Sequence, residues 1–176
     1  MINVRFHGRG GQGIVTSADI LAVAAANDGK YSQAMPAFGP ERTLAPVTAF
    51  CRIDDKPIVV YQEIYHPDIV VVLDPSLLSV VDVLKGLRPG GTVIINSKPS
   101  DFTCADCKLH FIDARPIAMK VMGKPFVNTV ILGALARTSG VVSMKSLSEA
   151  ILHRFPGEAG EKNAEAAKAC FDSCQI

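Results

Sequence analysis

The sequence predicts an α/β fold: a Rossmann-like, mostly parallel sheet flanked by helices, with a β-hairpin insertion and a helical C-terminal part. Three observations lead to this prediction. A strand-like run at residues 2–6 precedes a glycine-rich turn and a helix-like stretch. The apolar run 69–73 is uninterrupted, as expected for a strand buried on both faces. From residue 117 onward, apolar residues recur at helical spacing. The length of 176 residues makes one domain, residues 1–176, the expectation.

The first turn of the chain carries the spacing of a nucleotide- or anion-binding loop. Its glycines match the pattern G-x-G-x-x-G and precede a helix predicted over residues 14–27. Such glycines permit a tight turn and a close backbone approach to a ligand, and the amides at the helix start favour an anion. In the alternative interpretation, the glycines only let helix and strand pack closely. The candidate binding residues are Gly8, Arg9, Gly10, Gly11, Gln12 and Gly13.

Two familiar nucleotide sites do not fit this turn. In a dinucleotide fold, an acidic residue at the end of the second strand holds the ribose. Here the second strand is predicted over residues 30–33, and no acidic residue directly follows it, because Asp28 precedes the strand. No Gly-Lys-Ser or Gly-Lys-Thr follows the turn, which excludes a P-loop.

Residues 36–46 are predicted to form a long, ordered contact loop. Three prolines and one glycine prevent a regular element, and the apolar content argues against disorder. Glu41 and Arg42 are either a surface ion pair or contact residues, and we favour contact because ordered long loops usually carry function. The candidate residues at an interface or at the mouth of an active site are Pro36, Phe38, Gly39, Glu41, Arg42 and Pro46.

The predicted hairpin insertion follows this loop. Residues 47–53 and 58–61 are strand-like, and a turn of the sequence Asp-Asp-Lys-Pro separates them. Such a hairpin would add an antiparallel element to an otherwise parallel sheet, which is a common mixture.

Asp74 follows the buried strand 69–73 and has two interpretations. It stands at the C-terminal end of the strand, the edge where open α/β sheets bind ligands. It also precedes Pro75, and Asp-Pro is a helix start signal, so we favour a cap for a helix through Leu87. Two further strands are predicted over residues 92–96 and 108–112.

The remainder of the chain is predicted to be helical. Residues 125–138 place apolar side chains on one face and end before Gly140. Ser146-Leu147-Ser148-Glu149 has the pattern of a capping box for a helix to Arg154. Residues 158–174 are predicted to form a final amphipathic helix.

The cysteines allow a metal site but do not favour one. Their odd number, without a signal peptide, argues for reduced thiols. A C-x-x-C pair and a second pair at helical spacing could together form a tetrahedral zinc or iron–sulfur site. The two pairs are far apart in the sequence and no histidine motif joins them, so we expect surface or half-buried thiols and no metal. The five are Cys51, Cys104, Cys107, Cys170 and Cys174.

No pattern of catalytic residues is present, so we expect no catalytic residue on this chain. The four histidines are scattered, and none stands at a recognisable spacing from a nucleophile. His7 opens the glycine turn and is the only one worth testing, although we favour a packing or capping role for it. Zinc-protease, paired-carboxylate and nucleophile-elbow patterns are absent.

The amino-acid composition limits the classes of partner that the chain is expected to bind. Hydrophobic residues make up 48% and charged residues 20%, which fits a compact core or a subunit that buries surface against partners. The net charge of +1 gives no electrostatic support for nucleic acid. The sequence contains no run of 18 or more apolar residues, which argues against a membrane-spanning helix. The N-terminus lacks the features of a signal peptide. A cytoplasmic location is the natural expectation.

An ordered set of short segments resembles the gamma subunit of 2-oxoacid:ferredoxin oxidoreductases. The resemblance covers about the whole chain, and its Gly-Pro-Glu-Arg and Ala-Pro-Val pieces look most like the pyruvate (pyruvate synthase) branch. The segments that carry it are 6–13, 29–34, 38–42, 45–47 and 52–54, then Asp113-Ala114 before a helix and Asn128 in the next helix.

The resemblance implies one component of an enzyme of several subunits. Such an enzyme decarboxylates a 2-oxoacid, couples the acyl group to coenzyme A, and reduces ferredoxin. Thiamine diphosphate and the [4Fe–4S] clusters would belong to the alpha, beta and delta subunits, and this chain alone would bind no cofactor. It would be a structural and interface component, with possible contact to coenzyme A or to the active-site mouth.

One departure from the family pattern leaves the substrate open. The family usually has Arg-Gly or Thr-Gly before Ala-Pro, whereas this chain has Thr43-Leu44. Pyruvate, 2-oxoisovalerate and an aromatic oxoacid such as phenylglyoxylate therefore all remain candidates. Two alternatives from other classes are an independent Rossmann-type nucleotide-binding protein or oxidoreductase and a structural module without ligand.

Overall fold

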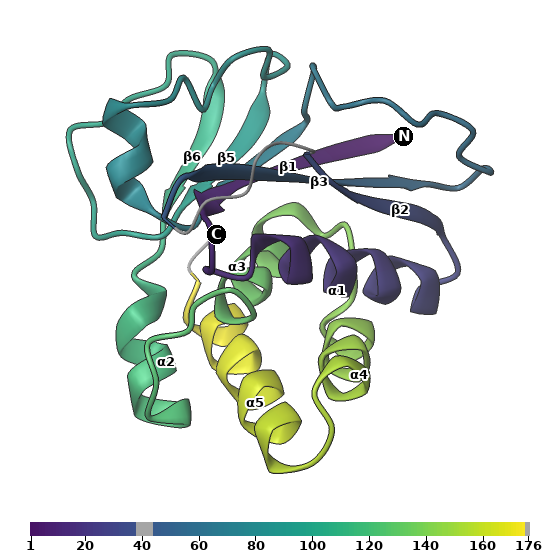
Figure 1. The fold of residues 1–176 in the computed structure, drawn as a ribbon, viewed down its shortest axis with the longest axis vertical. Coiled ribbons are helices and arrows are strands. Elements are labelled where there is room, and N and C mark those ends of the chain that lie inside the picture. The colour runs from purple at the N-terminus through teal and green to yellow at the C-terminus, as the bar shows by residue number, and fades with distance from the viewer. Residues whose placement is uncertain (38–43, 175–176) are drawn as a thin grey trace.

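A six-stranded mixed sheet forms the centre of the molecule (Figure 1). The computed structural model describes residues 1–37 and 44–174. The strand order is β2-β3-β1-β4-β5-β6, in which β1, β4, β5 and β6 run parallel and β3 runs antiparallel to both of its neighbours. The strands are β1 (Ile2–Arg9), β2 (Tyr31–Pro36), β3 (Pro46–Asp54), β4 (Ile69–Val72), β5 (Gly91–Ile95) and β6 (Cys107–Phe111).

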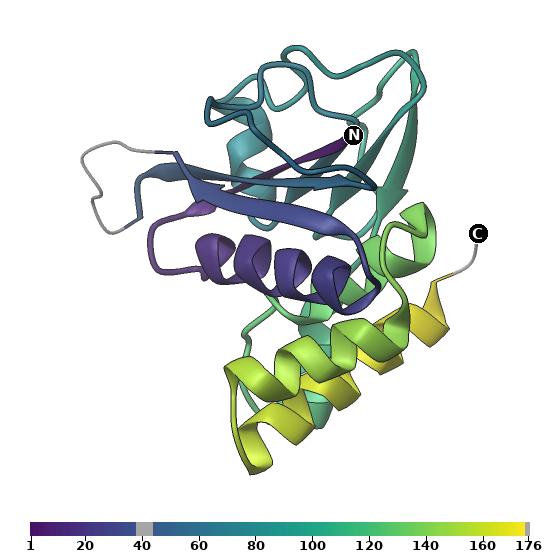
Figure 2. The same ribbon diagram turned by 90° about the vertical axis from the view of Figure 1, so that its right-hand side faces the viewer.

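The helices gather on one face of the sheet, and irregular segments with a short 3₁₀ turn cover the other (Figures 1 and 2). The helix α1 packs mainly on β2 and β3, while α3, α4 and α5 pack on one another beneath it. The helices are α1 (Ile14–Asn27), α2 (Ala114–Met122), α3 (Val130–Ser139), α4 (Met144–Arg154) and α5 (Glu158–Ser173). Among the residues that the structure describes, no helix combines the length and the apolar character that crossing a membrane requires.

Two apolar clusters bury the two faces of the sheet. The main cluster holds Val4 and Phe6 of β1 and Val71 of β4 against the helices. The second cluster holds Val70 and Val72 on the opposite face, under a segment between η1 and β5. Successive side chains of a strand point to opposite faces, so β4 is buried on both sides, as its uninterrupted apolar run predicted.

The predicted hairpin is wrong in one of its strands. Residues 58–61 form no strand, and β3 instead pairs with β2 and with β1. Both hydrogen-bonding edges of β3 are therefore occupied, and no edge is left for the segment that follows it. The antiparallel hairpin consists of β2 and β3, and residues 37–45 lie between the two strands in the sequence.

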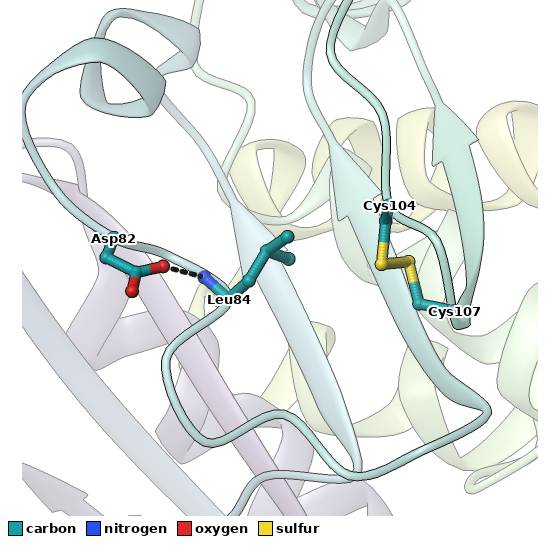
Figure 3. Close-up of a disulfide and its surroundings, with 4 residues drawn as sticks. All are labelled: Asp82, Leu84, Cys104 and Cys107. Atoms are coloured by element: carbon teal, nitrogen blue, oxygen red, sulfur yellow. Dashed lines mark hydrogen bonds between the residues drawn. A yellow bond between two sulfur atoms is a disulfide. The ribbon is translucent and has the colours of Figure 1, made fainter.

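The predicted helix over residues 74–87 is also wrong. Only a 3₁₀ turn, η1 (Pro75–Ser79), forms there, and Asp74 caps it by accepting a hydrogen bond of 3.0 Å from the Ser76 amide. Further along, the carboxylate of Asp82 accepts a hydrogen bond of 3.2 Å from the Leu84 amide (Figure 3). A side chain that bonds its own local backbone competes with helix formation, and short turns replace the helix here.

The C-terminal helices differ from the prediction mainly in where they begin. Helix α3 begins at Val130, several residues after the predicted start. Helix α4 is capped by Ser143, whose hydroxyl accepts a hydrogen bond of 3.1 Å from the Ser146 amide. The predicted capping box at Ser146 is therefore wrong, because that serine lies inside the first turn.

Candidate functional site

Three loops meet at the edge of the sheet where the parallel strands end. They are the glycine turn after β1, the end of the loop between β2 and β3, and the turn after β4. The Gly10 amide donates a hydrogen bond of 2.9 Å to the Ala45 carbonyl, and the Leu44 amide donates one of 3.3 Å to the Gly10 carbonyl. Since β1 and β4 run parallel, their C-terminal ends bring Arg9 and Asp74 to the same edge.

The side chain of Gln12 fills the inside of the glycine turn. Its Oε1 atom accepts a hydrogen bond of 2.7 Å from the Arg9 amide, and its Nε2 atom donates one of 2.8 Å to Oδ2 of Asp74. The Gln12 amide donates a further bond of 3.0 Å to the Arg9 carbonyl. This one side chain thus closes the turn and joins it to the end of β4.

The guanidinium of Arg9 contacts the other two loops. Its Nη1 atom donates a hydrogen bond of 2.9 Å to the Leu44 carbonyl, and its Nη2 atom donates one of 2.7 Å to Oγ of Ser76. Its Nε atom lies 3.2 Å from Oδ2 of Asp74. Burial raises the pKa of Asp74, but hydrogen bonds from Ser76 and Gln12 and the Arg9 charge outweigh that effect and hold the pKa below its usual value.

This network changes what the glycine turn can bind. The amides of Arg9, Gly10 and Gln12 all donate to partners within the chain, so they are not directed at a ligand as they are in a phosphate-binding loop. The outer side of the turn remains open as a pocket of about 260 Å³. Its lining residues are Arg9, Gly10, Gly11, Gly13, Ile14, Val15 and Val47.

The three glycines of the pattern have different surroundings. Gly8 lies within β1, where an added Cβ would stand 2.5 Å from Cγ2 of Ile14 in α1. At Gly13, the N-cap of α1, an added Cβ would stand 2.9 Å from Nδ2 of Asn128. The close packing of helix and strand therefore accounts for Gly8, whereas at Gly13 the space is filled by Asn128 and the positive φ of +76° also favours glycine. Asn128 lies just before α3, not in it as the resemblance implied.

The contact loop is described only at its two ends. Pro36 is the last residue of β2 and Pro46 the first of β3, while Phe38, Gly39, Glu41 and Arg42 lie outside the described residues. Leu44 has φ +70°, which makes it the single residue other than glycine with positive φ in the described part of the chain. Its side chain is 67% exposed. The departure from the family pattern thus falls at a left-handed position that favours glycine.

His7 lies in the interior of β1 and not at the glycine turn. Its Nε2 atom accepts a hydrogen bond of 3.0 Å from Nε of Arg5. Burial, and then the charge on Arg5, lower the pKa of His7 to about 4, although the charge of Asp82 opposes this shift. The imidazole is therefore neutral at neutral pH and serves as a buried acceptor.

The polar face of the sheet, on which His7 lies, was not predicted from the sequence. A cavity of about 540 Å³ opens there, between the sheet and the segments after β3 and η1; its lining includes Arg5, His7, Thr48, Phe50, Tyr65 and Asp82. The alternation of Asn3, Arg5 and His7 with apolar residues in β1 was the available signal. It indicates that one face of the strand is polar.

The cysteines differ from the prediction. Cys104 and Cys107 are joined by a disulfide (Figure 3), so the expectation of reduced thiols is wrong for this pair. Cys51, Cys170 and Cys174 are free but buried, whereas surface or half-buried thiols were expected. Within residues 1–37 and 44–174, no group of three or more His, Cys, Asp or Glu side chains could hold a metal ion.

Comparisons with known proteins place this geometry in a family. The chain matches the family described as pyruvate ferredoxin/flavodoxin oxidoreductase over residues 3–173. It is 55% identical to the pyruvate synthase subunit PorC of Methanothermobacter thermautotrophicus, over 99% of this chain and 97% of that protein. It is 54% identical to the common gamma subunit of the pyruvate/ketoisovalerate oxidoreductases of Thermococcus litoralis, over 100% of this chain and 98% of that protein.

A crystal structure agrees with the sequence comparisons. The pyruvate oxidoreductase subunit PORC of Thermotoga maritima matches with a TM-score of 0.85 and 34% identity, covering 97% of this chain and 95% of that one. On its sequence and its fold, the chain belongs to the pyruvate ferredoxin/flavodoxin oxidoreductase family.

Proposed function

We propose that this chain is the gamma subunit of a multi-subunit 2-oxoacid:ferredoxin oxidoreductase of the pyruvate type. The observation that carries the proposal is the identity of more than half of the residues to gamma-type subunits across nearly the whole length of both chains. The complex carries out the oxidative decarboxylation of a 2-oxoacid, with pyruvate as the favoured substrate. Coenzyme A accepts the acyl group, CO2 is released, and ferredoxin accepts the electrons.

The chain contributes contacts and no catalytic group. Its partners are the alpha, beta and delta subunits, and it meets ferredoxin only through the complex. Residues 1–176 act as one gamma-type domain, which the main apolar cluster supports by running from β1 to α5. Thiamine diphosphate and the [4Fe–4S] clusters belong to the other subunits. A cytoplasmic location fits an enzyme that delivers electrons to ferredoxin.

The contact surface lies at the edge where the three loops meet. Arg9 bonds the described end of the contact loop at Leu44, and Gln12 and Asp74 fix Arg9 and the glycine turn, so this end of the loop is held in one arrangement. A preorganised loop loses little entropy on docking. Coenzyme A is the ligand we assign to the open pocket on the outer side of the turn, where Arg9 offers a cation to a phosphate.

Reconstitution tests the proposal. The alpha, beta and delta subunits are produced with and without this chain, and pyruvate-dependent reduction of ferredoxin is measured together with the subunit composition of the purified complex. Full activity should require the chain. Arg9→Ala should weaken assembly or raise the KM for coenzyme A about tenfold, as expected for loss of a charge-assisted contact. Arg88→Ala is the matched control, since it removes a surface arginine elsewhere.

Two results would overturn the proposal. One is a complex that is fully active and complete without this chain. The other is tight, specific binding of a dinucleotide by the isolated chain, which would favour an independent nucleotide-binding protein. A chain that joins the complex while Arg9→Ala changes neither assembly nor kinetics would retain the gamma-subunit role but remove Arg9 from the contact surface.

A further inference from the structure

The C-x-x-C pair lies at the start of the edge strand β6, and its sulfur atoms are bonded to each other (Figure 3). Cys107 is the first residue of β6, and Cys104 precedes it in a turn. Nothing in the oxidoreductase role described above uses this pair.

The two cysteines have different surroundings. Cys107 packs against the second apolar cluster, which also includes Phe102 and Leu109. Cys104 is not part of either apolar cluster of the described chain, although both cysteines are half-buried. Because Cys107 packs against the apolar cluster and Cys104 does not, we expect an incoming reagent to approach Cys104.

The remaining cysteines are buried, so reagents reach them poorly. Cys51 and Cys170 are 0% exposed and Cys174 is 7% exposed. Burial raises the pKa of the Cys51 thiol, and a buried, protonated thiol is a poor nucleophile. Oxidation and reduction of the folded chain should therefore be confined to Cys104 and Cys107.

The fold does not depend on this disulfide. Strand β6 pairs with β5 along its whole length, from Gly91 opposite Cys107 to Ile95 opposite Phe111. The Gly90 amide also donates a hydrogen bond of 3.1 Å to the Asp106 carbonyl within the C-x-x-C turn. A disulfide that closes so short a loop restricts the unfolded chain very little, so its stabilising effect is small. Such a bond can open and close while the sheet persists.

We propose that Cys104 and Cys107 form a reversible thiol–disulfide exchange site. The co-reactant is a dithiol, either a small molecule or a protein of the thioredoxin class. Its thiolate attacks Sγ of Cys104, the Cys104–Cys107 bond breaks, and Cys107 leaves as a thiolate that takes up a proton. The second thiol of the co-reactant then breaks the mixed disulfide and releases Cys104 as a thiol. The pair gains two electrons and two protons, and the co-reactant is oxidised to its disulfide.

The exchange has a local structural result. Reduction removes the covalent closure of the turn that presents the Asp106 carbonyl to Gly90. The start of β6, at the edge of the sheet, then opens more easily, while the pairing with β5 holds the remainder of the strand. Since β6 is the edge strand of the sheet, this opening takes place at the border of the sheet and leaves the central strands unchanged.

Trapping with glutathione disulfide tests the assignment on the full-length chain. Cys107→Ala should capture one glutathione, and peptide mapping should locate it on Cys104. Cys104→Ala is the matched control and should react about tenfold more slowly, because Cys107 packs against the apolar cluster. In the wild-type chain, dithiothreitol should make two thiols reactive to maleimide under native conditions, and its removal in the presence of glutathione disulfide should restore the bond.

Hydrogen exchange of the wild-type chain completes the test. Reduction should speed exchange at Gly90 and at the turn 104–107, and leave β1 and β4 unchanged. The assignment is overturned if the two single variants react equally, if the wild-type disulfide resists dithiothreitol in the folded state, or if reduction unfolds the whole chain. The last two results would show that the disulfide is a structural bond that stabilises the fold.

Discussion

Gln12 and Asp74 are joined by a hydrogen bond of 2.8 Å from Nε2 of Gln12 to Oδ2 of Asp74, across the gap between the ends of β1 and β4. The Oε1 atom of the same Gln12 side chain accepts a hydrogen bond from the backbone amide of Arg9. The position therefore requires a donor toward Asp74 and an acceptor toward Arg9. Glutamine meets both requirements in a single orientation.

Gln12→Glu should destabilise the chain by about 1–3 kcal/mol, because a second carboxylate then faces Asp74 and the donor is lost. Urea unfolding at neutral pH measures the change. Gln62→Glu, on an exposed residue, is the matched control and should be nearly neutral. Equal stability of the two variants would show that the amide is not needed to join the two loops.

Leu44→Gly should stabilise the isolated chain by about 1 kcal/mol, because glycine adopts positive φ without the clash that a side chain suffers. Leu44→Ala is the control: it also removes the exposed side chain but retains the Cβ. Thermal unfolding of both variants separates the two effects. Were alanine and glycine to give the same stability, the left-handed backbone at this position would carry no strain.

His7 should make the folding stability depend on pH. Its pKa is lowered to about 4 in the folded chain, against about 6.5 for an ordinary histidine, so the unfolded chain binds the extra proton between these values. The stabilisation is complete above pH 6.5 and is lost as the pH falls toward 4, by an amount on the order of 3 kcal/mol.

The variant His7→Gln tests this dependence, since glutamine can still accept a hydrogen bond from Arg5. The free energy of unfolding in urea is measured for both proteins between pH 4 and pH 7. The wild-type curve should be steeper than that of the variant in this window. Parallel curves would mean that His7 is already protonated in the folded chain or is not buried.

Asp28, at the end of α1, should stabilise the packing of α1 against α4 through hydrogen bonds. Its carboxylate accepts hydrogen bonds from the Ser143 amide at 2.6 Å, the Ser143 hydroxyl at 2.7 Å and the Ser146 hydroxyl at 2.6 Å. Asp28→Ala should therefore cost about 1–3 kcal/mol in urea unfolding at neutral pH. Asp55→Ala removes an exposed carboxylate and is the control.

The same carboxylate gives a second readout in acid. Burial raises the pKa of Asp28, but the hydrogen bonds from Ser146 and Ser143 outweigh it, so the folded pKa is lowered. Its stabilising effect is present above the unfolded pKa of about 3.9 and is lost as the pH falls through the folded value. The difference between wild type and Asp28→Ala should shrink in that range, and a constant difference would contradict this assignment.

Elements with strong local signals were predictable from the sequence. The bounds predicted for α1, residues 14–27, match the structure, because small residues followed by glycine encode that helix locally. The buried strand β4 was evident from its apolar run. By contrast, the partner of β3 was missed, because strand pairing is decided by which edges are free in the assembled sheet, and no local pattern records that.

The candidate site shows the same division. The glycine turn was visible as a motif, and Asp74 was placed correctly at a strand end and as a cap. The link between the turn and Asp74 could not be predicted. Gln12 is recognised as the connecting side chain only when the partners of both atoms of its amide group are known in space. Similarly, the sequence showed that Leu44 stands where the family usually has glycine. The positive φ of Leu44 could be seen only in the backbone of the structure.

The position of β1 in the sheet has a consequence for synthesis on the ribosome. This strand, residues 2–9, precedes both of its neighbours in the chain, β3 and β4, which end at Asp54 and Val72. During synthesis, β1 must therefore remain unpaired until β3 has left the exit tunnel, and its second edge remains open until β4 follows. A strand with one apolar face that stays unpaired for that time is exposed to misassociation, and a chaperone that binds nascent chains would have a natural target in β1.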